Sequence, residues 1–185
     1  NGIEAQIIKC ARQEIPVFGI CGGYQMLGNV IDDSCNAETG EVVPGIGLLP
    51  VTTTFTLSKH RTRARGIICS QSGMWEMLGE KKCAGYEIHM GESYGIKNSM
   101  LEFSDGSTGG DSHDNIYGCY VHGIFDENGI AENIVRSLYN AKGLEYIGKG
   151  IDRKAYKEQQ YDILAEEVRK NIDMDFVYKI IEEGV

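Results

Sequence analysis

One short segment, residues 15–28, constrains the fold of this chain more than any other. An apolar run there ends at a cysteine framed by glycines, and a helix-like pattern then begins. A short run of this kind predicts a buried strand over 15–20, and Pro16 is tolerated at the first position of a strand. The five residues Gly19–Gly23 have the form G-x-nucleophile-x-G, with Cys21 in the place of the nucleophile. The segment therefore predicts strand, tight turn and helix, with Cys21 on the turn.

The glycines around Cys21 have a steric reason. A nucleophile on a sharp turn brings backbone close to backbone. We therefore expect that a side chain would not fit at Gly19 and Gly23. The following helix directs its N-terminal N–H groups toward Cys21, which favours the reactive thiolate. The N–H of Gly22 would then face an oxyanion formed on attack. A small buried cysteine in a glycine-rich turn is the alternative, and the flanking strand and helix favour catalysis.

Composition limits the other possibilities. The 185 residues, 42% of them hydrophobic, suffice for one core, so we expect a single domain over 1–185. A net charge of -9 disfavours nucleic acid and anionic membrane surfaces as partners. The six cysteines show no C-x-x-C pair, which argues against a zinc cluster and a disulfide framework and for a reducing, cytoplasmic location. We expect no metal in this chain, no signal segment and no membrane span, and the start at Asn1 suggests a piece of a longer protein.

The remaining periodicity indicates an α/β fold. Helical spacing over 2–14 leads into the strand at 15–20 and a helix over 23–31, and such alternation predicts a mostly parallel sheet with flanking helices and ligands at the carboxyl ends of its strands. Further elements are expected as strands over 51–57, 66–70, 85–91 and 116–122, loops over 32–44 and 104–115, and amphipathic helices over 131–142, 152–169 and 173–183. The basic run 60–65 is interpreted as a solvated strand end or hairpin, with no site assigned to it.

Two of these strands carry further candidates. Glu87 and His89 alternate with apolar neighbours and share one strand face, where they either orient each other or a substrate, or simply face solvent. His122 ends the strand expected over 116–122, just before Gly123, a position analogous to that of Cys21. A cysteine and a histidine at the carboxyl ends of two strands form the arrangement that an α/β Cys–His enzyme needs. A histidine that merely ends a strand is the alternative.

Five motifs together carry a resemblance to a known family: Pro16–Gly28, Gly47–Val51, Gly85–Gly91, Tyr120–Asp126 and Tyr161–Ala165. In this order they resemble the class I glutamine amidotransferase domains of the cobyric and cobyrinic acid synthase type, over nearly the whole chain. The Tyr86–Gly91 string resembles the cobyric acid branch more than the cobyrinic acid a,c-diamide or lipid II amidating branches. The resemblance implies a flavodoxin-like α/β fold that hydrolyses L-glutamine and passes ammonia to an ATP-dependent synthetase domain, which amidates corrin side-chain carboxylates in cobalamin biosynthesis.

The resemblance also implies roles for residues of this chain. Cys21 would attack the glutamine amide and form a thioester, and His122 would accept and return the proton. Gln25 would contact the amino-acid end of glutamine, and the backbone of His89, Met90 and Gly91 would line the substrate pocket. No cofactor is implied for this chain itself, because ATP and Mg²⁺ would belong to the synthetase domain.

The chain departs from the family pattern in three respects. Ile124 stands where class I glutaminases usually carry a glutamate, so Asp126 and Glu87 are the nearest candidates for orienting His122. The strand and Pro-Gly-Ser-type loop that usually precede the nucleophile strand do not appear, so we expect the fold to lack its N-terminal strand and these residues alone to be a poor glutaminase. The synthetase domain and a G-x-x-x-x-G-K-[ST] loop are likewise missing from the 185 residues.

Two other functions remain open at this stage. A Cys–His peptidase or other acyl hydrolase would use the same pair of residues, and the role of Gln25 separates it from a glutaminase. An inactive domain that serves as a docking or regulatory module would use the C-terminal helices as its interaction surface.

Overall fold

The computed structural model describes residues 2–69, 73–126, 129–148, 150 and 152–184. The chain forms two compact units, Asn1–Gly148 and Lys149–Val185. The single domain over 1–185 that composition suggests stays a prediction. The candidate catalytic residues all lie in the first unit.

The described elements of the first unit are helices and strands, and α-helices alternate with strands only over residues 3–32. In chain order they are α1 (Ile3–Arg12), β1 (Val17–Ile20), α2 (Gly22–Leu27), β2 (Val30–Asp32), β3 (Val42–Pro44), β4 (Thr52–Ile68), the 3₁₀ helix η1 (Gly73–Leu78), β5 (Lys82–Tyr94), β6 (Leu101–Phe103), β7 (Thr108–Gly109), β8 (Asp111–His113), β9 (Ile116–Cys119) and α3 (Ile130–Ala141). The predicted order of helix, strand and helix around Cys21 is confirmed.

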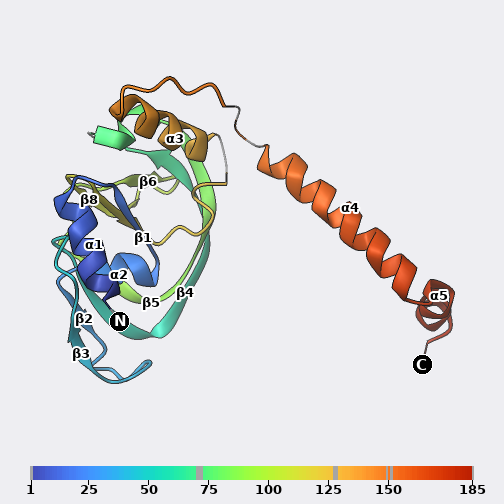
Figure 1. The fold of residues 1–185 in the computed structure, drawn as a ribbon. Helices are drawn as coiled ribbons and strands as arrows, with labels where there is room; N and C mark the ends of the chain where they lie inside the picture. Colours follow the sequence, from blue (N-terminus) through green and yellow to red (C-terminus); the bar gives the residue numbers. More distant parts are fainter. Residues whose placement is uncertain (1, 70–72, 127–128, 149, 151, 185) are drawn as a thin grey trace. The chain divides into compact units, whose positions relative to one another are not determined.

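The strands form two sheets of mixed direction. In the three-stranded sheet β1 pairs with β9 in parallel and β8 pairs with β9 antiparallel. The six-stranded sheet has the order β3-β2-β4-β6-β7, with β5 paired to β4; in it β2 and β4 run parallel and the other pairs are antiparallel. The long β4–β5 pair curves along the first unit (Figure 1). The α/β class is thus confirmed, and parallel pairing holds for β1 and β9, the strands that precede Cys21 and His122.

Several predicted boundaries are wrong, because tertiary pairing overrides local pattern. The helix expected over 23–31 ends at Leu27, and Val30–Asp32 instead pairs with β4. Gly28 permits this change, since a Cβ there would lie 2.6 Å from the carbonyl oxygen of Val51. The strands expected over 51–57 and 66–70 are one strand that includes the basic run. The expected loops over 32–44 and 104–115 contain β3, β7 and β8.

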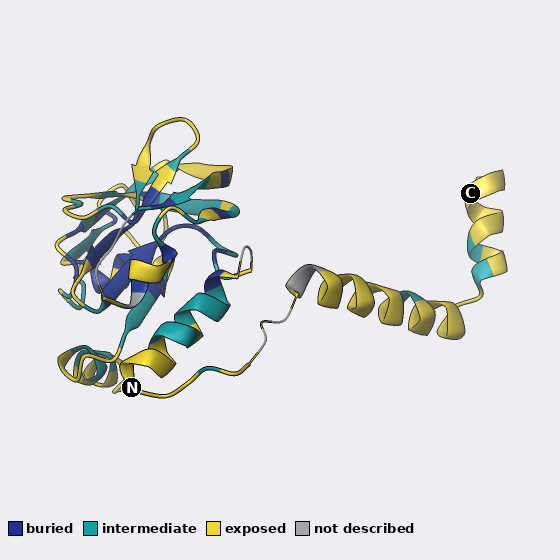
Figure 2. Ribbon diagram, turned by 90° about the horizontal axis from the view of Figure 1, so that it is seen from above, coloured by how far each residue is buried: buried dark blue, intermediate teal, exposed yellow. Residues whose placement is uncertain are grey.

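Two groups of buried side chains fill the first unit. One lies where Ile68, Trp75, Leu101 and Val121 meet, with Ile134 of α3 packed against it. The other surrounds Tyr24 and includes the side chains of Leu27, Leu49, Val51, Ile116 and Tyr120, with Ile7 and Ala11 of α1 packed against it. Figure 2 shows the buried residues gathered in the interior of the first unit, with exposed residues around them. The turn that carries Cys21 therefore lies against a packed core.

The second unit contains α4 (Arg153–Asn171) and α5 (Met174–Glu183). Each begins at an aspartate whose side chain accepts a backbone N–H bond, Asp152 from Ala155 and Asp173 from Phe176. The amphipathic character predicted for both helices holds for α5 but not for α4, whose apolar side chains are spread around its circumference.

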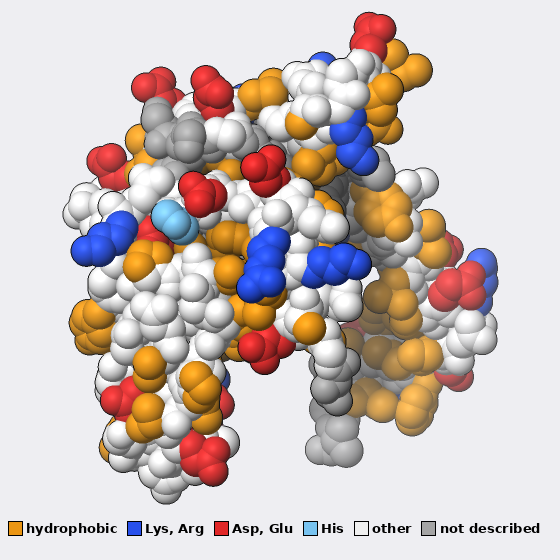
Figure 3. Space-filling model, turned by 60° about the vertical axis from the view of Figure 1, so that its left-hand side comes forward, with side chains coloured by type: hydrophobic (Ala, Val, Ile, Leu, Met, Phe, Trp, Pro, Cys, Tyr) orange, Lys and Arg blue, Asp and Glu red, His pale blue; other side chains and the backbone are white. Residues whose placement is uncertain are grey.

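The surface is mixed in charge. Acidic and basic side chains are interspersed over the face that Figure 3 shows, with hydrophobic side chains between them. In the part of the chain that the structure describes, no helix combines the length and apolar character that crossing a membrane would require.

Candidate active site

Cys21 occupies the strained turn that the glycine pattern predicts. Its backbone angles are φ 53° and ψ -115°, a region that side-chain-bearing residues rarely adopt. The Cys21 N–H donates to the carbonyl of Cys119 at 2.9 Å and so extends the β1–β9 ladder by one residue. Its own carbonyl accepts from Gln25 N at 3.1 Å and starts α2. Gly22 is exposed at the first position of this helix, where the helix leaves N–H groups unpaired.

The two glycines that flank Cys21 differ in what they permit. A Cβ on Gly19 would lie 2.7 Å from the backbone C and O of Gly23 and 2.7 Å from Cδ1 of Leu27. A Cβ on Gly23 would meet nothing within 4 Å. The crowding expected at Gly19 is confirmed, whereas the same expectation for Gly23 is wrong. Position 19 requires a glycine because the backbone of Gly23 lies so close to it, whereas position 23 itself has room for a side chain.

His122 is held against β5 from two directions. Its backbone exchanges both hydrogen bonds with Tyr86, His122 N to Tyr86 O at 2.8 Å and Tyr86 N to His122 O at 3.1 Å. Its imidazole stacks on the Tyr86 ring with centroids 5.0 Å apart and planes 8° apart. Among the described residues, no group forms a hydrogen bond with its buried Nε2 atom. A buried polar atom without a partner costs free energy and so calls for an explanation. An imidazole nitrogen left unpaired is free to take part in proton transfer.

Cys21 contacts the same stretch of β5. The Cys21 Sγ donates to the carbonyl of Ile88 at 3.6 Å, two residues along the strand from Tyr86. The register of β1 and β9 pairs Ile20 with Cys119, so both candidate residues leave their strands at the same edge. The structure thus brings Cys21 and His122 to one short segment of β5, with the thiol directed at a backbone carbonyl.

The two candidates for orienting His122 lie in different surroundings. The Glu87 carboxylate pairs with Nε2 of His60 at 3.4 Å, and it leaves β5 from the face opposite Tyr86. Burial raises the pKa of Glu87, and the neighbouring His60 opposes that rise. Asp126 is exposed and its N–H donates to the Gly123 carbonyl at 2.9 Å. A Cβ on Gly123 would lie 3.6 Å from Oδ2 of Asp126, so this carboxylate folds over the residue that follows His122.

The predicted substrate-binding residues gather around a tyrosine that the sequence analysis did not select. Gln25 is 7% exposed, and its Nε2 donates to the Tyr120 hydroxyl at 3.4 Å. The His89 ring stacks on Tyr120 with centroids 3.8 Å apart. A Cβ on Gly91 would lie 3.0 Å from Gln25 Nε2, so the Gly91 backbone approaches the amide closely. The sequence signal for Tyr120 was its place two residues before His122. Both residues follow β9, which ends at Cys119 and not at His122 as predicted.

Met90 and the far side of Tyr120 complete this cluster. The Met90 carbonyl accepts from the Thr56 hydroxyl at 3.0 Å. The Tyr120 hydroxyl lies 2.8 Å from that of Ser93, which in turn lies 2.8 Å from that of Thr53. A chain of polar groups therefore joins Gln25 to β4 and β5 through Tyr120.

A cavity of about 580 Å³ opens beside this cluster. Its lining includes Tyr24, His60, Glu87, His89, Ser93 and Tyr120. This cavity lies on the side of β5 that carries Glu87 and His89, whereas Cys21 and His122 approach the strand elsewhere and are not part of the lining.

Comparison with known proteins gives a consistent result. Residues 1–130 match the CobB/CobQ-like glutamine amidotransferase domain. Cobyric acid synthase of Ruminiclostridium cellulolyticum is 42% identical over 195 residues, covering 100% of this chain and 38% of that protein. Cobyric acid synthase of Lachnoclostridium phytofermentans is 40% identical over 201 residues, covering 100% of this chain and 39% of that protein. The chain therefore spans about two fifths of the length of these relatives.

Proposed function

Because this chain belongs to the CobB/CobQ-like glutamine amidotransferase domain family, we propose that it hydrolyses L-glutamine to glutamate and ammonia through a thioester on Cys21. The observation that carries the proposal is the convergence of a strained cysteine and a buried, unpaired imidazole nitrogen on one segment of β5. A thiol and an imidazole are the groups that acyl transfer requires.

The first half of the reaction forms the thioester. His122 accepts the thiol proton, and the Cys21 sulfur attacks the amide carbon of glutamine. The carbonyl oxygen takes the negative charge close to the N–H of Gly22. The intermediate collapses as the C–N bond breaks, and the imidazolium of His122 gives its proton to the departing nitrogen, which leaves as ammonia. The Cys21 side chain must first turn away from the Ile88 carbonyl, its hydrogen-bond acceptor in this structure.

The second half hydrolyses the thioester. His122 removes a proton from a water molecule, whose oxygen attacks the thioester carbon. The C–S bond breaks, the sulfur regains a proton from His122, and glutamate leaves. Throughout, the stacked and doubly hydrogen-bonded Tyr86 holds His122 in place, and Asp126, folded over Gly123, is the candidate for orienting its ring.

Gln25 and its neighbours supply specificity in this proposal. The buried amide of Gln25, fixed by Tyr120 and packed beside Gly91, would bind the amino-acid end of glutamine. The Gln25→Ala variant should therefore need more glutamine for half-maximal turnover, with Cys21 still reactive toward a small neutral alkylating reagent. Unchanged glutamine turnover in this variant would remove Gln25 from the substrate pocket.

The ammonia would serve a synthetase domain of the same longer protein. The relatives are cobyric acid synthases of which this chain covers two fifths, which supports an ATP-dependent amidation of corrin side-chain carboxylates in cobalamin biosynthesis as the final use. The corrin and the synthetase domain would be its partners.

Labelling with the glutamine analogue diazo-oxo-norleucine tests the proposal. We expect peptide mapping by mass spectrometry to find the label on Cys21 alone, blocked by excess glutamine. In His122→Ala the labelling rate should fall by about 10²–10⁴-fold, the contribution typical of a general base. Cys35 is an exposed free thiol and serves as an internal control that neutral reagents modify but the analogue does not. Equal labelling of Cys21 and Cys35, or an unchanged rate in His122→Ala, would refute the proposal.

A further inference from the structure

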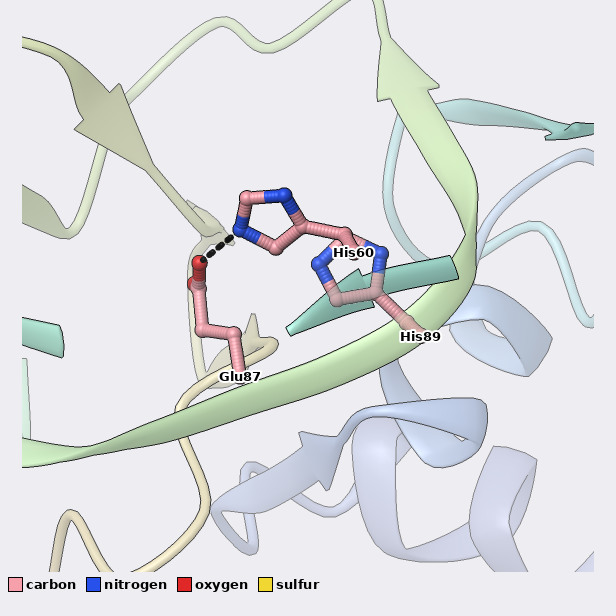
Figure 4. Close-up of side chains that lie close together, drawn as sticks. All are labelled: His60, Glu87 and His89. Carbon is pink, nitrogen blue, oxygen red and sulfur yellow. Dashed lines mark ion pairs between the residues drawn. The ribbon is translucent and has the colours of Figure 1, made fainter. Parts of the chain in front are cut away.

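Three side chains with metal-binding atoms converge on one face of the β4–β5 pair, outside the proposed catalytic pair. His60 on β4 stands directly opposite His89 on β5 in the strand register, and Glu87 lies on the same face two residues from His89. Directly opposed side chains on an antiparallel pair have Cβ atoms about 4.5–5.5 Å apart. Figure 4 shows the carboxylate and the two imidazole rings directed at one another. We call these three residues the His60 cluster.

The distances within the His60 cluster suit a single metal ion. The three nearest ligand atoms all lie within 4.8 Å of one another, and His60 Nε2 lies 3.4 Å from Glu87 Oε2. Zn²⁺ takes nitrogen and carboxylate ligands at about 2.0–2.2 Å, so two ligands of a tetrahedral ion lie about 3.3–3.6 Å apart. The His60–Glu87 pair already has that separation, and the other pairs, at most 4.8 Å apart, need to shorten by at most about 1.5 Å through side-chain rotation.

His89 is held in the form that binds metal. Its Nδ1 lies 2.6 Å from the carbonyl oxygen of Gly91, an acceptor, so Nδ1 carries the proton and Nε2 keeps its lone pair. The stack on Tyr120 fixes the plane of the ring. A carbonyl behind one nitrogen is the outer-shell contact that metal-bound histidines typically make.

The remaining two ligands differ in exposure. The Glu87 side chain is 13% exposed and the His60 side chain 52% exposed, so the carboxylate lies on the buried side of the cluster and His60 lies on the solvent side. The same cavity is lined by Glu92 and Asp105 and by Arg63 and Arg65, so its acidic groups outnumber its arginines once Glu87 is counted. The local charge therefore admits a divalent cation.

We propose that the His60 cluster binds one divalent first-row transition metal ion, with Zn²⁺ the ion that its two imidazoles and one carboxylate suit best. Three protein ligands leave a fourth position open, and here it faces the 580 Å³ cavity. Water or an oxygen or nitrogen atom of a small molecule in the cavity would occupy that position. The cysteine spacing predicts no zinc cluster, and this site uses none of the cysteines.

Titration of the metal-free 185-residue chain with Zn²⁺ and Co²⁺ tests the site. We expect one equivalent to bind, and the visible spectrum of Co²⁺ to show a site of nitrogen and oxygen ligands without the charge-transfer absorption of a thiolate. The His60→Ala variant alters an exposed strand position and should lose more affinity than the roughly 10–100-fold that outer-shell substitutions cost. Glu87→Gln, which keeps the side-chain volume, should weaken binding in the same direction.

His113→Ala is the matched control. His113 lies in β8, is exposed and has Asp114 at 3.6 Å, so it also pairs an imidazole with a carboxylate, but outside the His60 cluster. The control should bind Zn²⁺ as the unaltered chain does. Equal affinity in His60→Ala, equal losses in His60→Ala and His113→Ala, thiolate absorption with Co²⁺, or the absence of one-equivalent binding would each overturn the proposal. None of these results depends on glutamine turnover.

Discussion

The turn that carries Cys21 permits a matched test, because the same substitution at its two glycines has opposite expected effects. In Gly19→Ala the new methyl group would lie 2.7 Å from the backbone of Gly23 and from the Leu27 side chain. Carbon atoms in contact prefer about 3.5–4.0 Å, so the strand and the helix must separate by roughly 0.8 Å or more. Overpacking of this kind typically costs about 1–3 kcal/mol. A domain of this size loses about 2–4 °C in Tm for each kcal/mol, so Tm should fall by about 2–12 °C.

Gly23→Ala adds the same methyl group in open space. Nothing lies within 4 Å of the new carbon, and Gly23 is a helical residue without positive φ. Alanine is about 1 kcal/mol more favourable than glycine inside a helix, so stability should be unchanged or rise slightly. Urea unfolding of both variants measures the difference.

Labelling of Cys21 by diazo-oxo-norleucine then reports the position of the nucleophile. A displacement of about 1 Å can cost roughly 10²-fold in rate, so Gly19→Ala should also label slowly. A Gly19→Ala protein as stable as Gly23→Ala would refute the reasoning, because it would mean that the contact between β1 and α2 relaxes without cost.

Three further predictions concern other parts of the first unit. A methyl group on Gly85 would overlap the carbonyl of His122, so Gly85→Ala should lose about 1–3 kcal/mol in urea unfolding. Tyr86→Ala removes the ring stacked on His122 and should slow labelling of the nucleophile, whereas Tyr86→Phe keeps the stack and should restore it. Buried Asp33 accepts four backbone N–H bonds at 2.7–2.9 Å, that of Gly40 foremost, and these hold its pKa far below the usual range. Because a lowered folded-state pKa adds stability above the unfolded value of about 3.9, Asp33→Ala should destabilise most near neutral pH and progressively less as the pH falls below about 4 in urea titrations.

Local sequence signals were sufficient for the features around Cys21. Glycine spacing, an apolar run and a helical pattern occur within one short segment, so the order β1, turn, α2 and the crowding at Gly19 follow from neighbours in the chain. His122 was also locatable, since it closely follows a β-rich run, although β9 itself ends at Cys119. The extents of β4 and β5 were not predictable, because each is stabilised by the other strand across a long separation in sequence.

Register explains why the sequence alone did not place His60 beside Glu87 and His89. Phe55 pairs with Gly91, so an uninterrupted antiparallel ladder would set Leu57 opposite His89. The structure instead pairs His89 with His60, because the register shifts between Phe55 and His60. A register shift of this kind decides which β4 side chain lies opposite which β5 side chain on each face of the sheet. The alternation of polar and apolar residues along either strand does not predict it. The same shift turns part of a basic run, which looked like a solvated hairpin, into one wall of a cavity. If His60 binds metal as proposed, the irregularity in β4 is the feature that creates the site, and β5 then contacts His122 on the Tyr86 face and carries the metal ligands on the Glu87 face.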